Sequence, residues 1–120
     1  MSILDLTASP SPSPVQTANP MPKVKHIALL KFRGDTTQEQ IDKVFEELME
    51  LSESIPGIED YVTGTNNSPE GLEQGFTHGF VMTFQDAAAR DAYLPHPEHE
   101  RFKMSALPYV EKVAVFDFEV

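Results

Sequence analysis

Residues 93–102 read Tyr93-Leu94-Pro95-His96-Pro97-Glu98-His99-Glu100-Arg101-Phe102, and this stretch decides how the second half of the chain folds. A proline keeps the residue before it out of the α region, so Pro95 and Pro97 hold the backbone around His96 extended or turned. Pro97 can itself start a helix, because the first turn needs no N–H from it. We therefore predict a corner between two helical segments, which fixes the directions of an imidazole and a phenol.

The composition excludes several classes of protein. At 120 residues we expect one domain, and the absence of cysteine excludes disulfides and thiolate zinc sites. Its formal net charge of -10 argues against binding to nucleic acid or to anionic membrane surfaces, because both require basic patches. No apolar run reaches the roughly 20 residues of a transmembrane helix. We expect a soluble, cytoplasmic protein.

Residues 1–22 differ in composition from the rest of the chain. They contain five of the ten prolines, in part as Ser-Pro repeats, and a single charged residue, Asp5. The segment lacks the basic and apolar regions of a secretory signal. It also has no arginine, whereas transit peptides are rich in arginine. Such a composition is typical of a disordered segment. We predict a dispensable leader over residues 1–22 and a folded domain over residues 23–120.

The remaining sequence alternates between strand and helix patterns. Apolar alternation predicts strands over residues 24–32, 58–65, 75–84 and 111–120. Thr36 and Glu39 form a capping box that starts a helix, which ends before Pro56-Gly57. Asp86 caps a second helix, and a third begins at Pro97 and ends at Pro108. The order β-α-β-β-α-β predicts an α+β, ferredoxin-like fold with a four-stranded antiparallel sheet and the helices on one face.

The first predicted strand is apolar on both faces. His26 lies on one face with Ala28 and Leu30, and Ile27 and Leu29 lie on the other. The helices cover only one face, and a small domain that leaves the other uncovered usually dimerises. We expect a homodimer in which the two sheets form an α/β barrel.

The four histidines suggest a site. His26 and His78 occupy strands that are neighbours in this topology, and His96 and His99 belong to the corner. Three or four imidazoles and the Tyr93 phenol would then converge in an apolar cavity, where burial shifts pKa values and enables acid/base chemistry. The alternative is that each histidine is hydrogen-bonded separately. The His96-x-x-His99 spacing is a weak zinc signal without cysteine nearby, and we expect no metal.

Four segments of the sequence together resemble the stress-responsive dimeric A/B barrel (Dabb) family. They are Val24-Lys25-His26-Ile27-Ala28-Leu29-Leu30-Lys31-Phe32, Gly75-Phe76-Thr77-His78, His96-Pro97-Glu98-His99-Glu100-Arg101-Phe102 and Phe116-Asp117-Phe118. The resemblance implies a ferredoxin-like dimer. Some members are plant stress proteins without an assigned reaction, and another is a polyketide cyclase that performs an intramolecular aldol condensation. By this resemblance the catalytic roles would fall on Tyr93 and His99.

Two hypotheses follow. In the first, the domain binds a small hydrophobic molecule, with a pocket lined by the remaining histidines and three phenylalanines: His26, His78, His96, Phe45, Phe80 and Phe84. In the second, it is a cyclase-like enzyme in which His99 removes a proton from an activated methylene and Tyr93 stabilises the developing oxyanion. A heme- or oxygen-dependent relative would need a cofactor signature, which the sequence lacks. We therefore expect no cofactor.

Overall fold

The computed structural model describes residues 21–120. The predicted leader thus lies outside the described residues, apart from its last two positions. The elements follow in the order β1 (Val24–Phe32), α3 (Gln38–Ser54), β2 (Ile58–Thr65), β3 (His78–Phe84), α4 (Ala87–Tyr93), α5 (Pro97–Ala106), a 3-10 turn (Leu107–Tyr109) and β4 (Val110–Glu119). Within the described part of the chain, no helix has both the length and the apolar character needed to cross a membrane.

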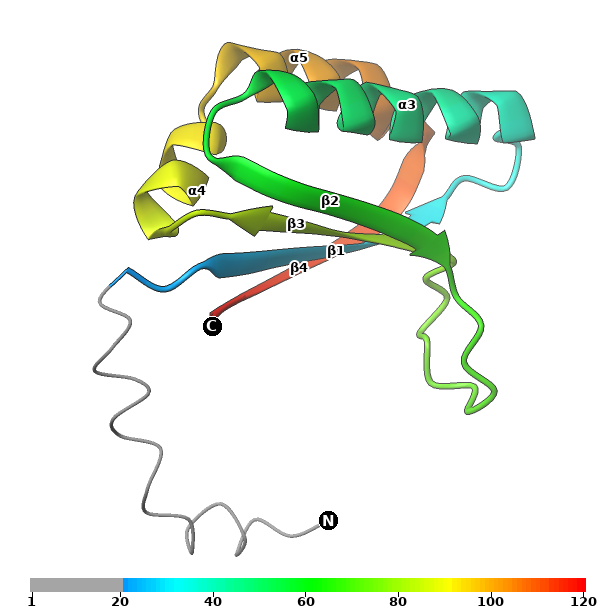
Figure 1. The fold of residues 1–120 in the computed structure, drawn as a ribbon. Coiled ribbons are helices and arrows are strands. Elements are labelled where there is room, and N and C mark those ends of the chain that lie inside the picture. The colour runs from blue at the N-terminus through cyan, green and yellow to red at the C-terminus, as the bar shows by residue number, and fades with distance from the viewer. Residues whose placement is uncertain (1–20) are drawn as a thin grey trace, which may run out of the picture.

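The four strands form one antiparallel sheet in the order β2-β3-β1-β4. This confirms the ferredoxin-like α+β fold. Figure 1 shows α3 and α5 side by side over one face of the sheet, with α4 at its end. In the centre of the sheet His26 of β1 lies opposite Met82 of β3 on one side and Asp117 of β4 on the other. The register therefore brings a histidine and a carboxylate together beneath the helices.

The core lies between this covered face and the helices. From the sheet come Val24, Ala28, Met82 and Phe84, and α3 contributes Val44, Leu48 and Leu51 at helical spacing. Full burial of a valine, leucine, methionine or phenylalanine side chain contributes about 1.5–3 kcal/mol. The other face of the sheet stays apolar but exposed in the single chain, through residues such as Leu29, Val62, Phe116 and Phe118.

The helix cap differs from the prediction by one residue. Thr37, rather than Thr36, is the N-cap of α3: its hydroxyl accepts from the Gln40 N–H, and the Gln40 side chain accepts from the Thr37 N–H. Thr36 has other partners, because its N–H donates to the Arg33 carbonyl and its hydroxyl donates to the Tyr109 carbonyl at 3.3 Å. That contact from the C-terminal half of the chain decides between two adjacent threonines.

Two strand boundaries also differ from the prediction. β3 begins at His78 rather than Gly75, because Gly75 has a φ of 84°, which a strand does not accommodate, and the Phe76 N–H donates to the Glu73 carbonyl within a turn. β4 runs from Val110 to Glu119, one residue earlier at each end than predicted. Val120 still exchanges backbone hydrogen bonds with Lys23, at 2.9 and 3.2 Å, so the sheet hydrogen bonding continues past the formal strand ends.

Candidate ligand-binding and acid/base site

The proline corner is built as two capped helix ends. α4 ends at Tyr93 and α5 begins at Pro97. His96 is the N-cap of α5, and its Nδ1 accepts a hydrogen bond from the Glu98 N–H at 3.0 Å. This satisfies one of the N–H groups that a helix start leaves unpaired. The imidazole of His96 therefore holds the corner in shape.

The corner brings Tyr93 and His99 into contact. Their ring centroids lie 4.2 Å apart, and Tyr93 is only 1% exposed and packs on Phe84. The Nδ1 of His99 lies 2.9 Å from the carbonyl oxygen of Leu94. A carbonyl only accepts, so Nδ1 carries the proton. In the neutral ring, Nε2 is then a hydrogen-bond acceptor and a potential base.

Burial shifts the pKa values of both groups. Desolvation is the main cause that lowers the pKa of His99; the charge of Lys103 also lowers it, and the hydrogen bond to Leu94 acts in the opposite direction. Desolvation raises the pKa of Tyr93 well above its ordinary value. At neutral pH the pair therefore consists of a neutral imidazole and a protonated phenol.

His26 joins this pair from the sheet. It is 6% exposed, and its ring centroid is 6.0 Å from that of Tyr93. Its Nδ1 lies 2.8 Å from Oδ1 of Asp117, whose Oδ2 accepts a hydrogen bond from the Arg90 guanidinium at 2.8 Å. Asp117 and Arg90 were not among the predicted site residues. The sequence does hold a signal for Asp117. Alternation along β4 places its carboxylate on the covered face, while its neighbours Phe116 and Phe118 point to the other face.

A cavity of about 280 Å³ adjoins these groups, between α5 and the sheet. His26, Tyr93, His99 and Lys103 are its polar residues. The rest of the lining is apolar: Ala28, Leu30, Val44, Phe80, Leu94, Phe102, Ala106, Leu107, Val110, Val113 and Val115. Ligand pockets commonly range from about 300 to 1,000 Å³; this cavity lies just below that range, so its size suits a molecule smaller than most ligands.

Not all of the predicted pocket residues meet there. Phe80 lines the cavity, and Phe84 lies beside it against Tyr93 and His26. His78 instead stacks on Phe45, with centroids 5.6 Å apart. The register explains this placement, because His78 lies opposite Leu30, four residues along β1 from His26 and thus roughly 13 Å away.

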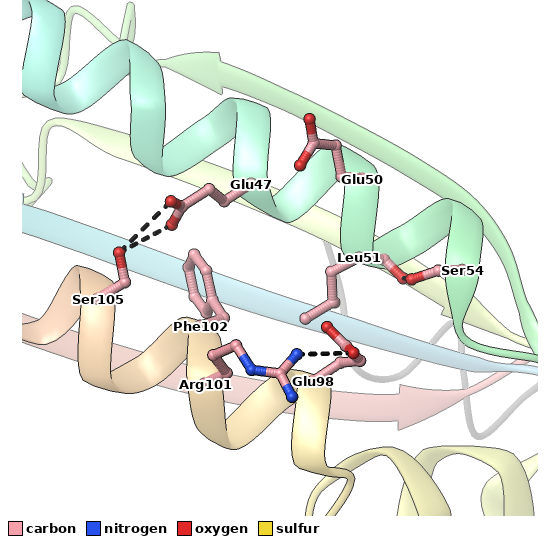
Figure 2. Close-up of a pocket in the computed structure, with 8 residues that line it drawn as sticks. All are labelled: Glu47, Glu50, Leu51, Ser54, Glu98, Arg101, Phe102 and Ser105. Carbon is pink, nitrogen blue, oxygen red and sulfur yellow. Dashed lines mark hydrogen bonds and ion pairs between the residues drawn. The ribbon is translucent and has the colours of Figure 1, made fainter.

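A second hollow, of about 340 Å³, lies between α3 and α5 (Figure 2). Its rim is polar: Ser105 donates to Glu47 at 3.0 Å, and Arg101 pairs with Glu98 at 2.7 Å. It contains no histidine or tyrosine, so it offers no acid/base pair of the kind found beneath α5. Across residues 21–120, no three His, Asp or Glu side chains come together as metal ligands.

Known proteins share both the sequence and the fold of this domain. Olivetolic acid cyclase from Cannabis sativa is 30% identical over 95 residues, which cover 79% of this chain and 94% of the cyclase. A hydroxynitrile lyase from Passiflora edulis has a similar structure, with a TM-score of 0.78 and 26% identity over 84% of this chain and 95% of the lyase. A dimeric ferredoxin-like protein of unknown function from Jannaschia sp. CCS1 matches with a TM-score of 0.73 and 28% identity, over 82% of this chain and 99% of that one.

The family model of the stress responsive A/B barrel domain matches residues 24–120, which is the whole length of the sheet and its helices. The segments that carry the resemblance in the sequence all lie within this match. The chain therefore belongs to the stress responsive A/B barrel domain (Dabb) family.

Proposed function

We propose that the domain binds a small, largely apolar molecule with an oxygen-bearing group in the cavity beneath α5. The observation that carries this proposal is the contact between Tyr93 and His99 beside a cavity that is otherwise apolar. The apolar part of the ligand packs against Val113, Val115 and Leu30, and its oxygen group meets the phenol and the imidazole. Convergent polar groups in an apolar pocket are typical of ligand sites.

The same proposal includes a homodimer that forms through the outer face of the sheet. Leu29, Phe116 and Phe118 expose apolar surface there, and Phe116 is 67% exposed in the single chain. Contiguous apolar patches of this kind mark interaction surfaces. The dimeric ferredoxin-like protein from Jannaschia sp. CCS1 supports this assembly by its similarity to this chain.

Calorimetric binding of 4-propylphenol tests the ligand site. The His99→Ala and Tyr93→Phe variants each remove one polar partner, and each should weaken binding by about tenfold, which is the effect of one net hydrogen bond. Met104→Ala is the matched control, because Met104 lies on the same helix, is 80% exposed and does not line the cavity. Equal affinity of all four proteins would refute the proposed site.

The tautomer of His99 favours a second candidate function, a cyclase-like enzyme. Nε2 of His99 takes a proton from a methylene between two carbonyl groups, and the Tyr93 hydroxyl donates a hydrogen bond to the enolate oxygen. The enolate carbon attacks a carbonyl further along the same molecule and forms the new C–C bond. The imidazolium of His99 then returns the proton to the resulting alkoxide, so the histidine ends in its starting state.

Turnover of a linear poly-β-keto substrate tests this second function. The wild type should form the cyclised product, and His99→Ala and Tyr93→Phe should abolish its formation, because each removes one of the two groups that act on the enolate. Binding of 4-propylphenol without any wild-type turnover would leave the binding function and eliminate the enzyme.

A further inference from the structure

The carboxylate of Asp117 joins the site to α4. One oxygen lies 2.8 Å from Nδ1 of His26, and the other accepts a hydrogen bond from the Arg90 guanidinium, also at 2.8 Å. Arg90 makes a further bond, from Nε to Asp91 at 2.7 Å. Asp117 therefore has no oxygen that faces only solvent; each contacts a defined partner.

These partners determine where the proton of His26 lies. A carboxylate only accepts hydrogen bonds, so Nδ1 must be the protonated nitrogen. Arg90 supplies a permanent positive charge to Asp117, so the carboxylate does not require an imidazolium as its counter-ion. With Nδ1 engaged by Asp117, Nε2 is the ring nitrogen of His26 left to accept a hydrogen bond, and His26 lines the cavity.

We propose that Asp117 and Arg90 are positioning residues that hold His26 in its Nδ1–H form and thereby give the cavity a second imidazole acceptor beside His99. The inference rests on the proposed ligand site and names the chemistry it selects: an apolar molecule whose polar group is a hydroxyl donor. A ligand that carries only an acceptor, such as a methyl ether, can accept a hydrogen bond from the Tyr93 phenol. It can donate none to the imidazoles of His26 and His99.

The Asp117→Asn substitution separates this role from a purely structural one. Arg90 can only donate, so it must face the amide oxygen that replaces Oδ2. The amide NH₂ is then left facing Nδ1 of His26, which has to accept. The proton moves to Nε2, which changes from an acceptor into a donor, although the size of the Asp117 side chain is almost unchanged.

The first measurement is the ¹⁵N spectrum of the histidine rings at neutral pH, which distinguishes the two tautomers without any ligand. We expect the Nδ1–H form of His26 in the wild type and the Nε2–H form in Asp117→Asn. Asp91→Asn is the matched control, because Asp91 is the other carboxylate to which Arg90 donates, and its change should leave the tautomer of His26 unchanged. An Nε2–H or doubly protonated His26 in the wild type, or no tautomer change in Asp117→Asn, would overturn the inference.

The second measurement is the affinity ratio of 4-propylphenol to 4-propylanisole, which differ in the hydroxyl donor. The wild type should prefer the phenol, and Asp117→Asn should reduce this preference by about tenfold, the effect of one net hydrogen bond. A tautomer change without a change in the ratio would show that His26 does not meet the ligand. If the wild type binds neither probe, the proposed function fails, whereas the tautomer experiment still decides the role of Asp117. Thermal melting of each variant verifies that it is folded.

Discussion

At the scale of single residues, one apolar environment acts on two ionisable groups in opposite directions. Burial disfavours the charged form of each, so it lowers the pKa of His99 and raises that of Tyr93. A base and a hydrogen-bond donor thus both stay neutral near pH 7, with their rings 4.2 Å apart. His78, in its separate aromatic environment, also has a pKa lowered by burial.

The lowered pKa values of His78 and His99 predict how stability depends on pH. Below about pH 6.5, the ordinary histidine pKa, the unfolded chain binds protons at these positions before the folded chain does. The free energy of unfolding should therefore fall as the pH drops through this window, until the lower folded pKa values are reached. Urea unfolding between about pH 7 and pH 5.5 measures the slope. The His78→Gln/His99→Gln double variant should have a flatter profile, and an unchanged profile would contradict these shifts.

At the scale of secondary-structure elements, the corner between α4 and α5 positions the site. Asp86 caps α4 and His96 caps α5, so each short helix has a fixed start. Tyr93 lies in the last turn of α4 and His99 in the first turn of α5. The relative placement of the phenol and the imidazole therefore depends on the helix ends more than on the sheet.

Removal of the cap of α5 should affect both stability and binding. His96→Ala deletes the acceptor for the Glu98 N–H, and loss of an N-cap typically costs about 1 kcal/mol. The same variant should weaken 4-propylphenol binding, because α5 carries His99. His96→Asn, which retains a side-chain acceptor, should restore both properties. Denaturant unfolding that finds His96→Ala as stable as the wild type would show that the cap does not support the corner.

Local patterns predicted much of the fold, and long-range contacts decided the rest. β1 and β2 have their predicted bounds, because alternation and the Pro56-Gly57 stop are local signals. The choice of Thr37 over Thr36 as the cap depends on the remote Tyr109 carbonyl.

The same division holds for the site. Tyr93 and His99 are near in sequence, and the corner that joins them could be predicted. The separation of His78 from His26 depends on the register of two strands, which no local pattern encodes. The link from His26 to Asp117 likewise needs β4 to return beside β1, so only the assembled sheet reveals it.

At the scale of the whole molecule, the sheet has two faces with different roles. The helices bury one face and leave the cavity beneath α5, while the other presents Leu29, Phe116 and Phe118 without a cover in the single chain. The cavity residues Ala28 and Val115 lie on the covered face, whereas Leu29 and Phe116 lie on the other face. Assembly and ligand binding should therefore respond to different substitutions.

A charge on the outer face should separate these two properties. Light scattering of the wild type at micromolar concentration should give twice the chain mass of 13.4 kDa, and Leu29→Glu should give the single-chain mass because it buries an unpaired carboxylate at the interface. Lys43→Glu, an exposed change on α3, is the control for added negative charge and should remain dimeric. A wild-type mass of one chain would refute the proposed dimer.

The most direct test of the proposed site is whether the bound probe lies in the cavity beneath α5 or in the groove between α3 and α5. Methyl NMR spectra are recorded while 4-propylphenol is added to the full chain. We expect shifts at Leu30, Val113 and Val115, which line the cavity, and little change at Leu51, which lines the groove between α3 and α5. Shifts at Leu51 with the cavity methyl groups unchanged would contradict it and place the ligand outside the site of Tyr93 and His99.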